Sequence, residues 1–244
     1  MSEPALTAMA WLRWDVVERL WRRIGPVEKV VEVGAGRGAV GVRLARRARH
    51  YVGYEPDATS AAVARSRVEA THRGTVRTAI LDAAAATGDA DVVCAFEVLE
   101  HIDDDLGALE AWGAQLKPGG WLLLSVPAFA ERYGPCDAHV GHLRRYDPDL
   151  LRERLVAAGY TVEEIALYGW GLGYALESAR NAIVRRKKPP ESVAERTAGS
   201  GRFFQPPDAL GVVTAAATAP FRLLQRMQPA KGTGLVALAR KPAA

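Results

Sequence analysis

The sequence predicts an α/β protein built on a doubly wound, mostly parallel sheet. Short runs of β-branched and apolar residues alternate with segments of helical periodicity along most of the chain. Its 244 residues, 49% of them hydrophobic and 25% charged, can bury one sizeable core. We therefore expect one main domain in which most strands are followed by a helix.

A leading helix is expected first. Between Ala5 and Ile24 the apolar residues recur every three or four positions, as they do on one face of a helix. Gly25 and Pro26 then end this pattern. Residues 1–27 are therefore predicted to form an N-terminal helix that precedes the core.

The core is expected to occupy residues 28–168. Its first two strand–helix units make the sheet parallel, because each strand is followed by a helical segment that must cross back over the sheet. The alternation then continues to the end of this region. The expected strands cover residues 29–33, 50–54, 76–81, 91–96, 121–126 and 160–167, and the expected helices cover 39–48, 57–71, 103–116 and 147–158.

The alternation of expected strands and helices ends after residue 168. A stretch rich in Arg and Lys at 185–188 is followed by two Pro-Pro pairs and a Gly-Ser-Gly tract, with helical pieces expected on either side. We expect residues 169–231 to form a helical insertion that caps the sheet as a lid or acceptor wall. Residues 232–244 would return to the core as its final strand, near 235–239.

Composition and charge narrow the class of protein. The net charge of +4 comes from 32 basic and 28 acidic residues without a long basic block, so no nucleic-acid partner is expected. No signal peptide is visible and no apolar run approaches the ~20 residues needed to span a bilayer. The two cysteines, Cys94 and Cys136, have neither pairing nor metal-type spacing, which favours a cytoplasmic location. A monomer and a homodimer remain equally open.

A glycine-rich turn follows the first strand. Gly34, Gly36 and Gly38 stand where the strand turns into a helix, so that backbone amides can approach a bound ligand. Glu55 follows the second strand, where a carboxylate can accept hydrogen bonds from both ribose hydroxyls of a nucleoside. This spacing also satisfies the looser dinucleotide pattern, so a nicotinamide-dependent oxidoreductase is an alternative.

Four segments, taken in order, resemble the class I S-adenosylmethionine-dependent methyltransferases. The resemblance covers nearly the whole chain apart from the insertion. It implies a Rossmann-like, seven-stranded sheet whose last strand runs antiparallel beside the preceding one, an ending that a dehydrogenase would lack. The segments are Val31-Glu32-Val33-Gly34-Ala35-Gly36-Arg37-Gly38, Gly53-Tyr54-Glu55-Pro56, Phe96-Glu97-Val98-Leu99-Glu100-His101-Ile102 and Leu116-Lys117-Pro118-Gly119-Gly120-Trp121-Leu122-Leu123-Leu124-Ser125-Val126-Pro127.

The resemblance also implies where S-adenosylmethionine lies. The glycine turn would lie beneath the methionine part, Glu55 would bind the ribose, and Asp82 would accept from the adenine amino group. Asp82 is alternatively a turn residue at the end of a strand. The residues implied in cofactor binding are Glu32, Gly34, Ala35, Gly36, Glu55, Pro56, Asp82, Ala83 and Glu97.

Three ionisable residues follow the strand at 91–96. Glu97 and His101 are expected to line the cofactor pocket or to place the substrate, with no metal. In the alternative structural role, Glu100 and His101 bond neighbouring loops. The segment also resembles metal-using members of the family, namely small RNA 2'-O-methyltransferases and a ubiquinone-pathway O-methyltransferase. In that alternative, Glu97, Glu100, His101 and a distant His142 would hold a divalent ion that binds the acceptor hydroxyl.

A loop rich in His, Arg and Tyr follows the strand at 121–126. It resembles a bacterial methyltransferase group with the pattern Asp-x-x-x-Gly-His-x-Arg-Arg-Tyr, here Asp137 to Tyr146. His142 is the first candidate for a general base, His139 the second, and His101 a further catalytic candidate. Arg144 and Arg145 would suit an anionic group on the acceptor, or would pair with surface acids.

The sequence therefore predicts methyl transfer from S-adenosylmethionine to a small-molecule acceptor through an oxygen nucleophile. The acceptor is expected to belong to a carbohydrate, lipid-linked or secondary-metabolite pathway. A peripheral contact between the Arg-rich stretch and an acidic membrane surface is a further expectation. The alternatives are the nicotinamide oxidoreductase and a catalytically silent regulatory protein with the same fold.

Overall fold

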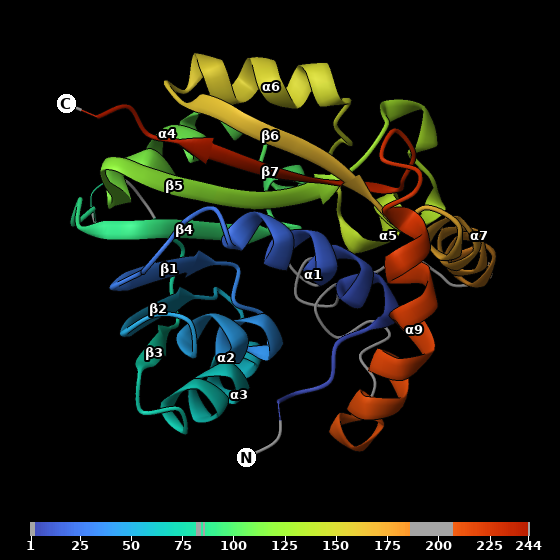
Figure 1. Ribbon diagram of the computed structural model, residues 1–244, viewed down its shortest axis with the longest axis horizontal. Coiled ribbons are helices and arrows are strands. Elements are labelled where there is room, and N and C mark those ends of the chain that lie inside the picture. Colours follow the sequence, from blue (N-terminus) through green and yellow to red (C-terminus); the bar gives the residue numbers. More distant parts are fainter. Residues whose placement is uncertain (1–2, 82–83, 85, 186–206, 244) are drawn as a thin grey trace.

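The computed structural model describes residues 3–81, 84, 86–185 and 207–243. One twisted sheet runs through the molecule with helices on both of its faces (Figure 1). The strands are β1 (Lys29–Val33), β2 (His50–Tyr54), β3 (Gly74–Arg77), β4 (Ala90–Phe96), β5 (Leu116–Pro127), β6 (Thr161–Tyr168) and β7 (Gly234–Arg240). The α-helices are α1 (Ala8–Trp21), α2 (Ala39–Ala45), α3 (Ala58–Glu69), α4 (Asp105–Gln115), α5 (Pro135–Val140), α6 (Pro148–Ala157), α7 (Leu172–Val184) and α9 (Gly211–Gln225), and the 3₁₀ turns are η2 (Leu99–His101), η3 (Ala130–Arg132) and η4 (Asp208–Leu210).

The seven strands lie in the order β3-β2-β1-β4-β5-β7-β6. Strands β1 to β5 pair in parallel, whereas β7 runs antiparallel between β5 and β6 (Figure 1). The predicted seven-stranded sheet with its antiparallel last strand is therefore confirmed. All strands except β7 thus have their carboxyl ends on the same side of the sheet. This carboxyl edge carries the polar residues discussed below.

The third strand lies earlier in the chain than predicted. It covers Gly74–Arg77 rather than residues 76–81. As an edge strand it pairs only with β2, and the ladder stops at Arg77 because its partner Tyr54 is the last residue of β2. Ile80 beyond it is 76% exposed, so the apolar character of this segment did not mark a strand.

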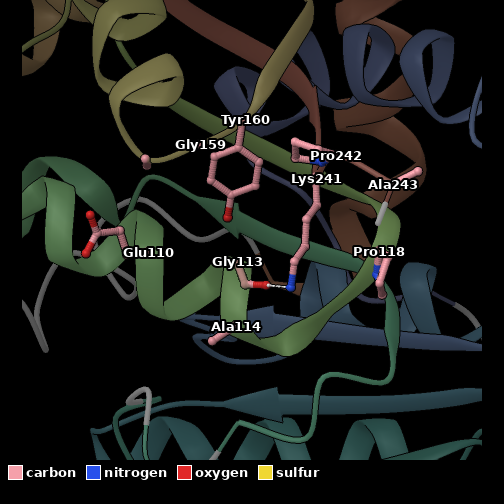
Figure 2. Close-up of a pocket in the computed structure, with 10 residues that line it drawn as sticks. Glu110, Gly113, Ala114, Pro118, Gly159, Tyr160, Lys241, Pro242 and Ala243 are labelled. Carbon is pink, nitrogen blue, oxygen red and sulfur yellow. Dashed lines mark hydrogen bonds between the residues drawn. The ribbon is translucent and has the colours of Figure 1, made fainter.

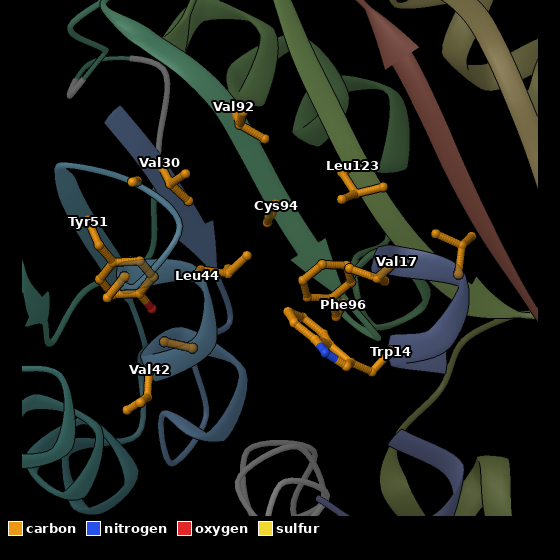
Figure 3. Packing of buried hydrophobic residues seen from close by; sticks show 14 of the residues in the cluster. Trp14, Val17, Val30, Val42, Leu44, Tyr51, Val92, Cys94, Phe96 and Leu123 are labelled. Carbon is orange, nitrogen blue, oxygen red and sulfur yellow. The ribbon is translucent and has the colours of Figure 1, made fainter. Parts of the chain in front are cut away.

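Alternate residues of the strands face two separate cores. Val92, Cys94 and Phe96 of β4 point toward α1 and α2, where they pack with residues such as Trp14 and Leu44 (Figure 3). Their sequence neighbours Val93 and Ala95 face the opposite core with Trp112 of α4 and Leu151 and Leu155 of α6. This period of two is the reason that the central strands read as continuous apolar runs.

Two helices are described between β6 and β7. Helix α7 follows β6 directly, and α9 packs against α1. Residues 186–206 of the expected insertion lie outside the described residues, and its role as a lid stays a prediction. Among the described residues no helix is long and apolar enough to cross a membrane.

Candidate active site

The turn after β1 requires glycine for two physical reasons. Gly34 and Gly36 have φ angles of +70° and +52°, in the left-handed region that favours glycine. A Cβ on Gly34 would also lie 2.5 Å from Cγ2 of Val98, which no real Cβ tolerates. The amides of Gly34 and Ala35 both donate to the carbonyl of Tyr54, at 2.9 and 3.0 Å, and so fix the turn against the end of β2.

The Glu55 carboxylate closes this turn. Its Oε2 accepts from the amide of Gly36 at 2.8 Å, and its Oε1 accepts from the amide of Asp57 at 2.9 Å. Burial raises the pKa of Glu55, although these two amides oppose that shift. Each oxygen keeps a second acceptor site for a ribose hydroxyl. Pro56 is exposed beside it, whereas Asp82 and Ala83 lie outside the described residues.

Glu32 occupies a different position from the other predicted cofactor residues. It is buried within β1 and accepts a hydrogen bond from the Tyr51 hydroxyl. Burial raises the pKa of Glu32 to about 8, so the neutral acid is favoured in the folded protein near pH 7. Its contact with a side chain of β2 gives Glu32 a structural function whether or not it also meets the cofactor.

Glu97 follows β4 and joins four elements. Its Oε1 accepts from the hydroxyls of Ser125 on β5, at 2.8 Å, and Tyr168 on β6, at 3.1 Å, and lies 3.4 Å from a guanidinium nitrogen of Arg13 on α1. Burial acts to raise the pKa of Glu97, but Arg13 and these hydroxyls hold it below its ordinary value. Arg13 and Tyr168 were not foreseen from the sequence, although the position of Arg13 between the apolar residues Leu12 and Trp14 of the first helix was a signal.

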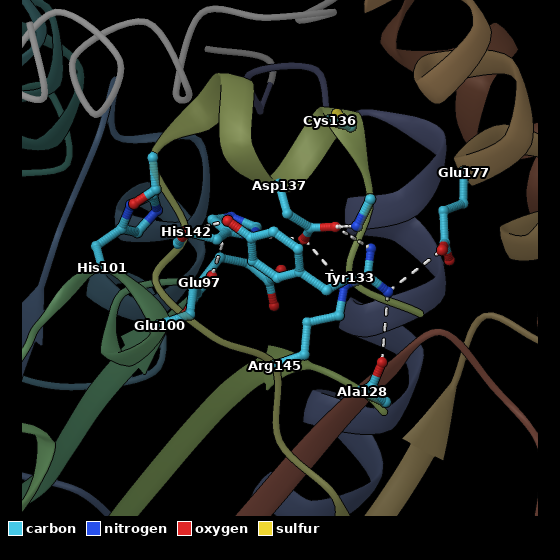
Figure 4. A network of polar contacts seen from close by, with 12 residues as sticks. Glu97, Glu100, His101, Ala128, Tyr133, Cys136, Asp137, His142, Arg145 and Glu177 are labelled. Atoms are coloured by element: carbon cyan, nitrogen blue, oxygen red, sulfur yellow. Dashed lines mark hydrogen bonds and ion pairs between the residues drawn. The ribbon is translucent and has the colours of Figure 1, made fainter. Parts of the chain in front are cut away.

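Glu100, His101 and His142 form a cluster at the same edge of the sheet. One donor atom from each lies within 4.8 Å of the others. The distance from His142 Nε2 to Glu100 Oε1 is 3.6 Å (Figure 4). The imidazole rings of His101 and His142 lie edge to face, with 4.8 Å between their centroids. Glu100 is fully buried, yet neither of its oxygens has a hydrogen-bond partner from another described residue. Burial raises the pKa of this carboxyl well above its ordinary value.

Both histidines are oriented through Nδ1. His142 Nδ1 lies 2.7 Å from the Asp137 carboxylate, and His101 Nδ1 lies 3.1 Å from the carbonyl oxygen of Gly141. Since both partners are acceptors, each Nδ1 carries a proton, and in the neutral ring Nε2 then keeps its lone pair. This is the arrangement in which protein histidines bind metal ions.

Asp137 is itself held by Arg145. The Arg145 guanidinium donates to both Asp137 oxygens, at 2.9 and 2.7 Å, and to Glu177 of α7 at 3.2 Å (Figure 4). Burial opposes ionisation of Asp137, but the bonds from His142 and Arg145 lower its pKa to about 2. Arg145 is thus engaged by acids, as is Arg144, which lies 3.0 Å from Asp105.

The remaining candidates lie outside this cluster. His139 is on α5, and Glu97 bonds other partners, so the structure brings together three of the four residues of the metal alternative. A cavity of about 510 Å³ opens elsewhere, between Glu110, Tyr160 and Lys241 (Figure 2). It lies where β5 and β6 begin, and Lys241 is already bound to two backbone carbonyls there. The cavity is therefore at the opposite edge from the ligand-binding edge of such sheets.

The cluster fits a divalent cation. One carboxylate without hydrogen-bond partners and two imidazole nitrogens with free lone pairs are ligands used by Zn²⁺, Mn²⁺ and related ions. A buried acceptor that nothing satisfies costs about 1–3 kcal/mol, which a bound cation would offset. The expectation of a site without metal stays a prediction, and this geometry supplies donors for its alternative.

Fold and site together define an α/β protein whose glycine turn and Glu55 are suited to a nucleoside cofactor at the carboxyl edge of its sheet. Residues 7–165 match the family model described as a methyltransferase domain. The chain therefore belongs to the S-adenosylmethionine-dependent methyltransferases, whose cofactor is S-adenosylmethionine. The nicotinamide alternative is not supported.

The relatives agree with this assignment. The ubiquinone biosynthesis O-methyltransferase of Hahella chejuensis is 34% identical over 121 residues, which cover 47% of this chain and 49% of the relative. A probable S-adenosylmethionine-dependent methyltransferase of Mycolicibacterium smegmatis is 30% identical over 157 residues, covering 62% and 59%. The chain thus spans about half the length of the curated relatives it matches.

Solved structures confirm the fold. A geranyl diphosphate C-methyltransferase from Streptomyces coelicolor, in complex with Mg²⁺, geranyl diphosphate and S-adenosylhomocysteine, has a TM-score of 0.62 at 16% identity, covering 94% of this chain and 79% of that one. The [4+2]-cyclase SpnF has a TM-score of 0.58 at 18% identity over the full length of both chains. Because a cyclase shares the fold, the reaction must be argued from the site.

Proposed function

We propose that this protein transfers the methyl group of S-adenosylmethionine to a hydroxyl oxygen of a small-molecule acceptor in a biosynthetic pathway. The observation that carries the proposal is the buried Glu100 carboxylate facing His101 and His142. A site with free carboxylate and imidazole acceptors suits activation of a hydroxyl, which must lose a proton to become a good nucleophile. An amine acceptor needs such help less.

The residues that bind the cofactor need only to position it, and no acid–base chemistry is required of them. The sulfonium already activates the methyl carbon, so the protein must align the acceptor oxygen with it and exclude water. Gly34, Ala35 and Gly36 would hold the methionine part through the turn, and Glu55 would accept from the ribose hydroxyls. Glu97, which follows the neighbouring strand β4, lies 3.4 Å from Arg13 of α1.

On the acceptor side, Glu100, His101 and His142 would hold a divalent cation. When bound, such an ion lowers the pKa of a coordinated hydroxyl. Asp137 keeps the His142 ring oriented and its Nδ1 protonated, and the carbonyl of Gly141 does the same for His101. Arg145 keeps Asp137 ionised and in place.

A metal-free mechanism is a second candidate, and the 2.7 Å contact between His142 and Asp137 favours it. In that case His142 Nε2 accepts the proton of the acceptor hydroxyl, and Asp137 stabilises the imidazolium that forms. His139 and His101 would then be further candidates for the base. Both mechanisms share an oxygen acceptor and differ in their response to chelators.

The names of the relatives support an oxygen acceptor. Several ubiquinone biosynthesis O-methyltransferases are 29–34% identical to this chain over roughly 100–120 residues. We extend from them only the class of reaction, O-methylation of a biosynthetic small molecule, with carbohydrate, lipid-linked and secondary-metabolite acceptors as the range to test. A cytoplasmic location is part of the same proposal.

The test is transfer of labelled methyl groups into fractionated small molecules of the source cell. We expect a labelled O-methyl ether, loss of labelling in chelator, and recovery with Mn²⁺ or Mg²⁺. Labelling that is indifferent to chelator but lost in His142→Gln would select the metal-free mechanism. A labelled carbon or nitrogen would contradict the oxygen acceptor, and S-adenosylmethionine binding without any turnover would identify a catalytically silent protein.

A further inference from the structure

Helix α9 is inverted relative to an ordinary surface helix. The residues that it buries are polar, Thr218 and Gln225. Phe221 packs against the core, but most of the other large apolar residues of the helix face outward, with Val212 82%, Leu223 65% and the following Met227 72% exposed. A surface helix normally buries its apolar stripe against the core, so this orientation requires an explanation.

Specific polar contacts hold α9 in this orientation. Gln225 donates to the carbonyl of Leu12 at 3.0 Å and accepts from the amide of Gly169 at 2.9 Å. Arg226, just after the helix, forms a bidentate ion pair with Asp15 of α1. These bonds to α1 and to the end of β6 fix the rotation of the helix, so the outward position of its apolar side is built into the fold.

The exposed side forms one continuous uncharged face. At 100° per residue, its members lie within about 160° of the helix circumference. The helix has 15 residues and is therefore about 22 Å long. The face consists of Val212, Val213, Ala216, Ala217, Ala219, Pro220, Leu223, Leu224 and Met227.

The charged residues within the segment that carries this face are all basic. No Asp or Glu occurs from residue 209 to 231, whereas Arg222, Arg226 and Lys231 do. Asp208, the acid just before the helix, is already paired with Arg67 at 2.7 Å, so it is not free to balance the cations of a second copy packed on this face. Arg226 keeps 57% of its side chain exposed beside its partner Asp15, and Lys231 is exposed, so an anionic surface complements the cations and an apolar interior complements the face.

We propose that α9 docks the protein on the surface of an anionic lipid bilayer, with its apolar face in the boundary between head groups and acyl chains. An interfacial helix of this kind has an uncharged apolar side and cationic flanks, and its binding scales with the apolar area that it buries. The docking is peripheral and needs no membrane-spanning segment.

The position of α9 connects this surface to the active site. Leu12 and Asp15 of α1 hold α9, and Arg13 between them lies against Glu97. The docked helix is thus separated from the site by α1 alone. Under the proposed O-methyl transfer, this arrangement suits an acceptor that is itself embedded in lipid, although the docking does not depend on the acceptor.

The test is flotation of the full chain with lipid vesicles. With vesicles containing about 30% phosphatidylglycerol, wild-type protein is expected to float. The double variant Val213→Glu/Leu223→Glu should lose at least about tenfold in binding, because two apolar side chains that enter the lipid become charged. Val156→Glu is the matched control, since Val156 on α6 is 58% exposed against 61% for Val213.

Three results would overturn the proposal. The first is wild-type protein that stays with the unbound fraction, and the second is a double variant that floats like wild type. The third is a wild-type dimer in light scattering that the double variant dissociates, which would assign the face to a second copy. S-adenosylmethionine affinity, measured in parallel, shows that the variants are folded, and it separates a failure of docking from a failure of the proposed reaction.

Discussion

The glycine turn and the histidine cluster lie at the same edge of the sheet but are built differently. The turn consists of backbone atoms and one carboxylate, all within residues 34–57, and its geometry follows from positive φ angles and one close approach to Val98. The cluster consists of side chains from η2 and from the loop after α5, held by residues as distant as Glu177. Cofactor binding should therefore respond to local backbone changes, and acceptor chemistry to changes in a distributed polar network.

The largest expected effect is on the turn. Gly34→Ala should weaken S-adenosylmethionine binding about 100-fold, because the new Cβ would overlap Val98 and displace the turn from the cofactor. Gly159→Ala is the matched control, since its φ of +85° carries the same backbone strain, about 1–2 kcal/mol, with no atom near the new Cβ. Titration calorimetry compares the two. Equal affinities would show that the turn tolerates a side chain.

The next effect should appear in the polar network. Asp137→Asn removes the ionised acceptor that orients His142, so kcat should fall about 10–100-fold while S-adenosylmethionine affinity stays unchanged. Glu177→Gln perturbs Arg145 without touching His142 and should retain kcat within about threefold. Steady-state kinetics and calorimetry on both variants check this separation. A parallel loss of cofactor affinity in Asp137→Asn would show that the two halves are not independent.

Glu55→Gln should have a smaller effect, confined to the cofactor half. A neutral amide accepts more weakly from ribose hydroxyls than a carboxylate does, so affinity for S-adenosylmethionine should fall about tenfold. With saturating cofactor, kcat and the response to chelator should match wild type. Unchanged affinity would place the ribose elsewhere.

The last prediction concerns Glu32 and the stability of the fold rather than binding or turnover. Burial raises the pKa of Glu32 to about 8 in the folded protein, above its value of about 4.3 in an unfolded chain. The stabilisation that it gives is fully present below the unfolded pKa and is lost as the pH rises through the folded pKa. Glu32→Gln should therefore reduce the loss of unfolding free energy between pH 5 and pH 8, by about 3–4 kcal/mol for a folded pKa of about 8. Urea unfolding at both pH values measures it, and an unchanged pH dependence would contradict the buried neutral acid.

The same division explains what could be predicted from the sequence. The sheet, the turn and Glu55 were predictable because strand alternation and glycine spacing are local signals. Glu100, His101 and His142 were each identified as candidates from the sequence. The bonds that Glu97 forms instead, with Arg13, Ser125 and Tyr168, depend on how α1 and β6 pack against the sheet. Residue spacing does not encode that packing. The inverted face of α9 was missed for the same reason, because only tertiary contacts show which side is buried.

Direct measurement of Mn²⁺ binding tests the assignment of the acceptor half most directly. Electron paramagnetic resonance should show one bound ion in wild-type protein and loss of that ion in Glu100→Gln, with S-adenosylmethionine affinity equal in the two proteins. The amide nearly preserves the shape of Glu100 and removes its charge, so the comparison isolates the ligand. Mn²⁺ binding that is absent from the wild type, or that is unaffected by Glu100→Gln, would contradict the metal site.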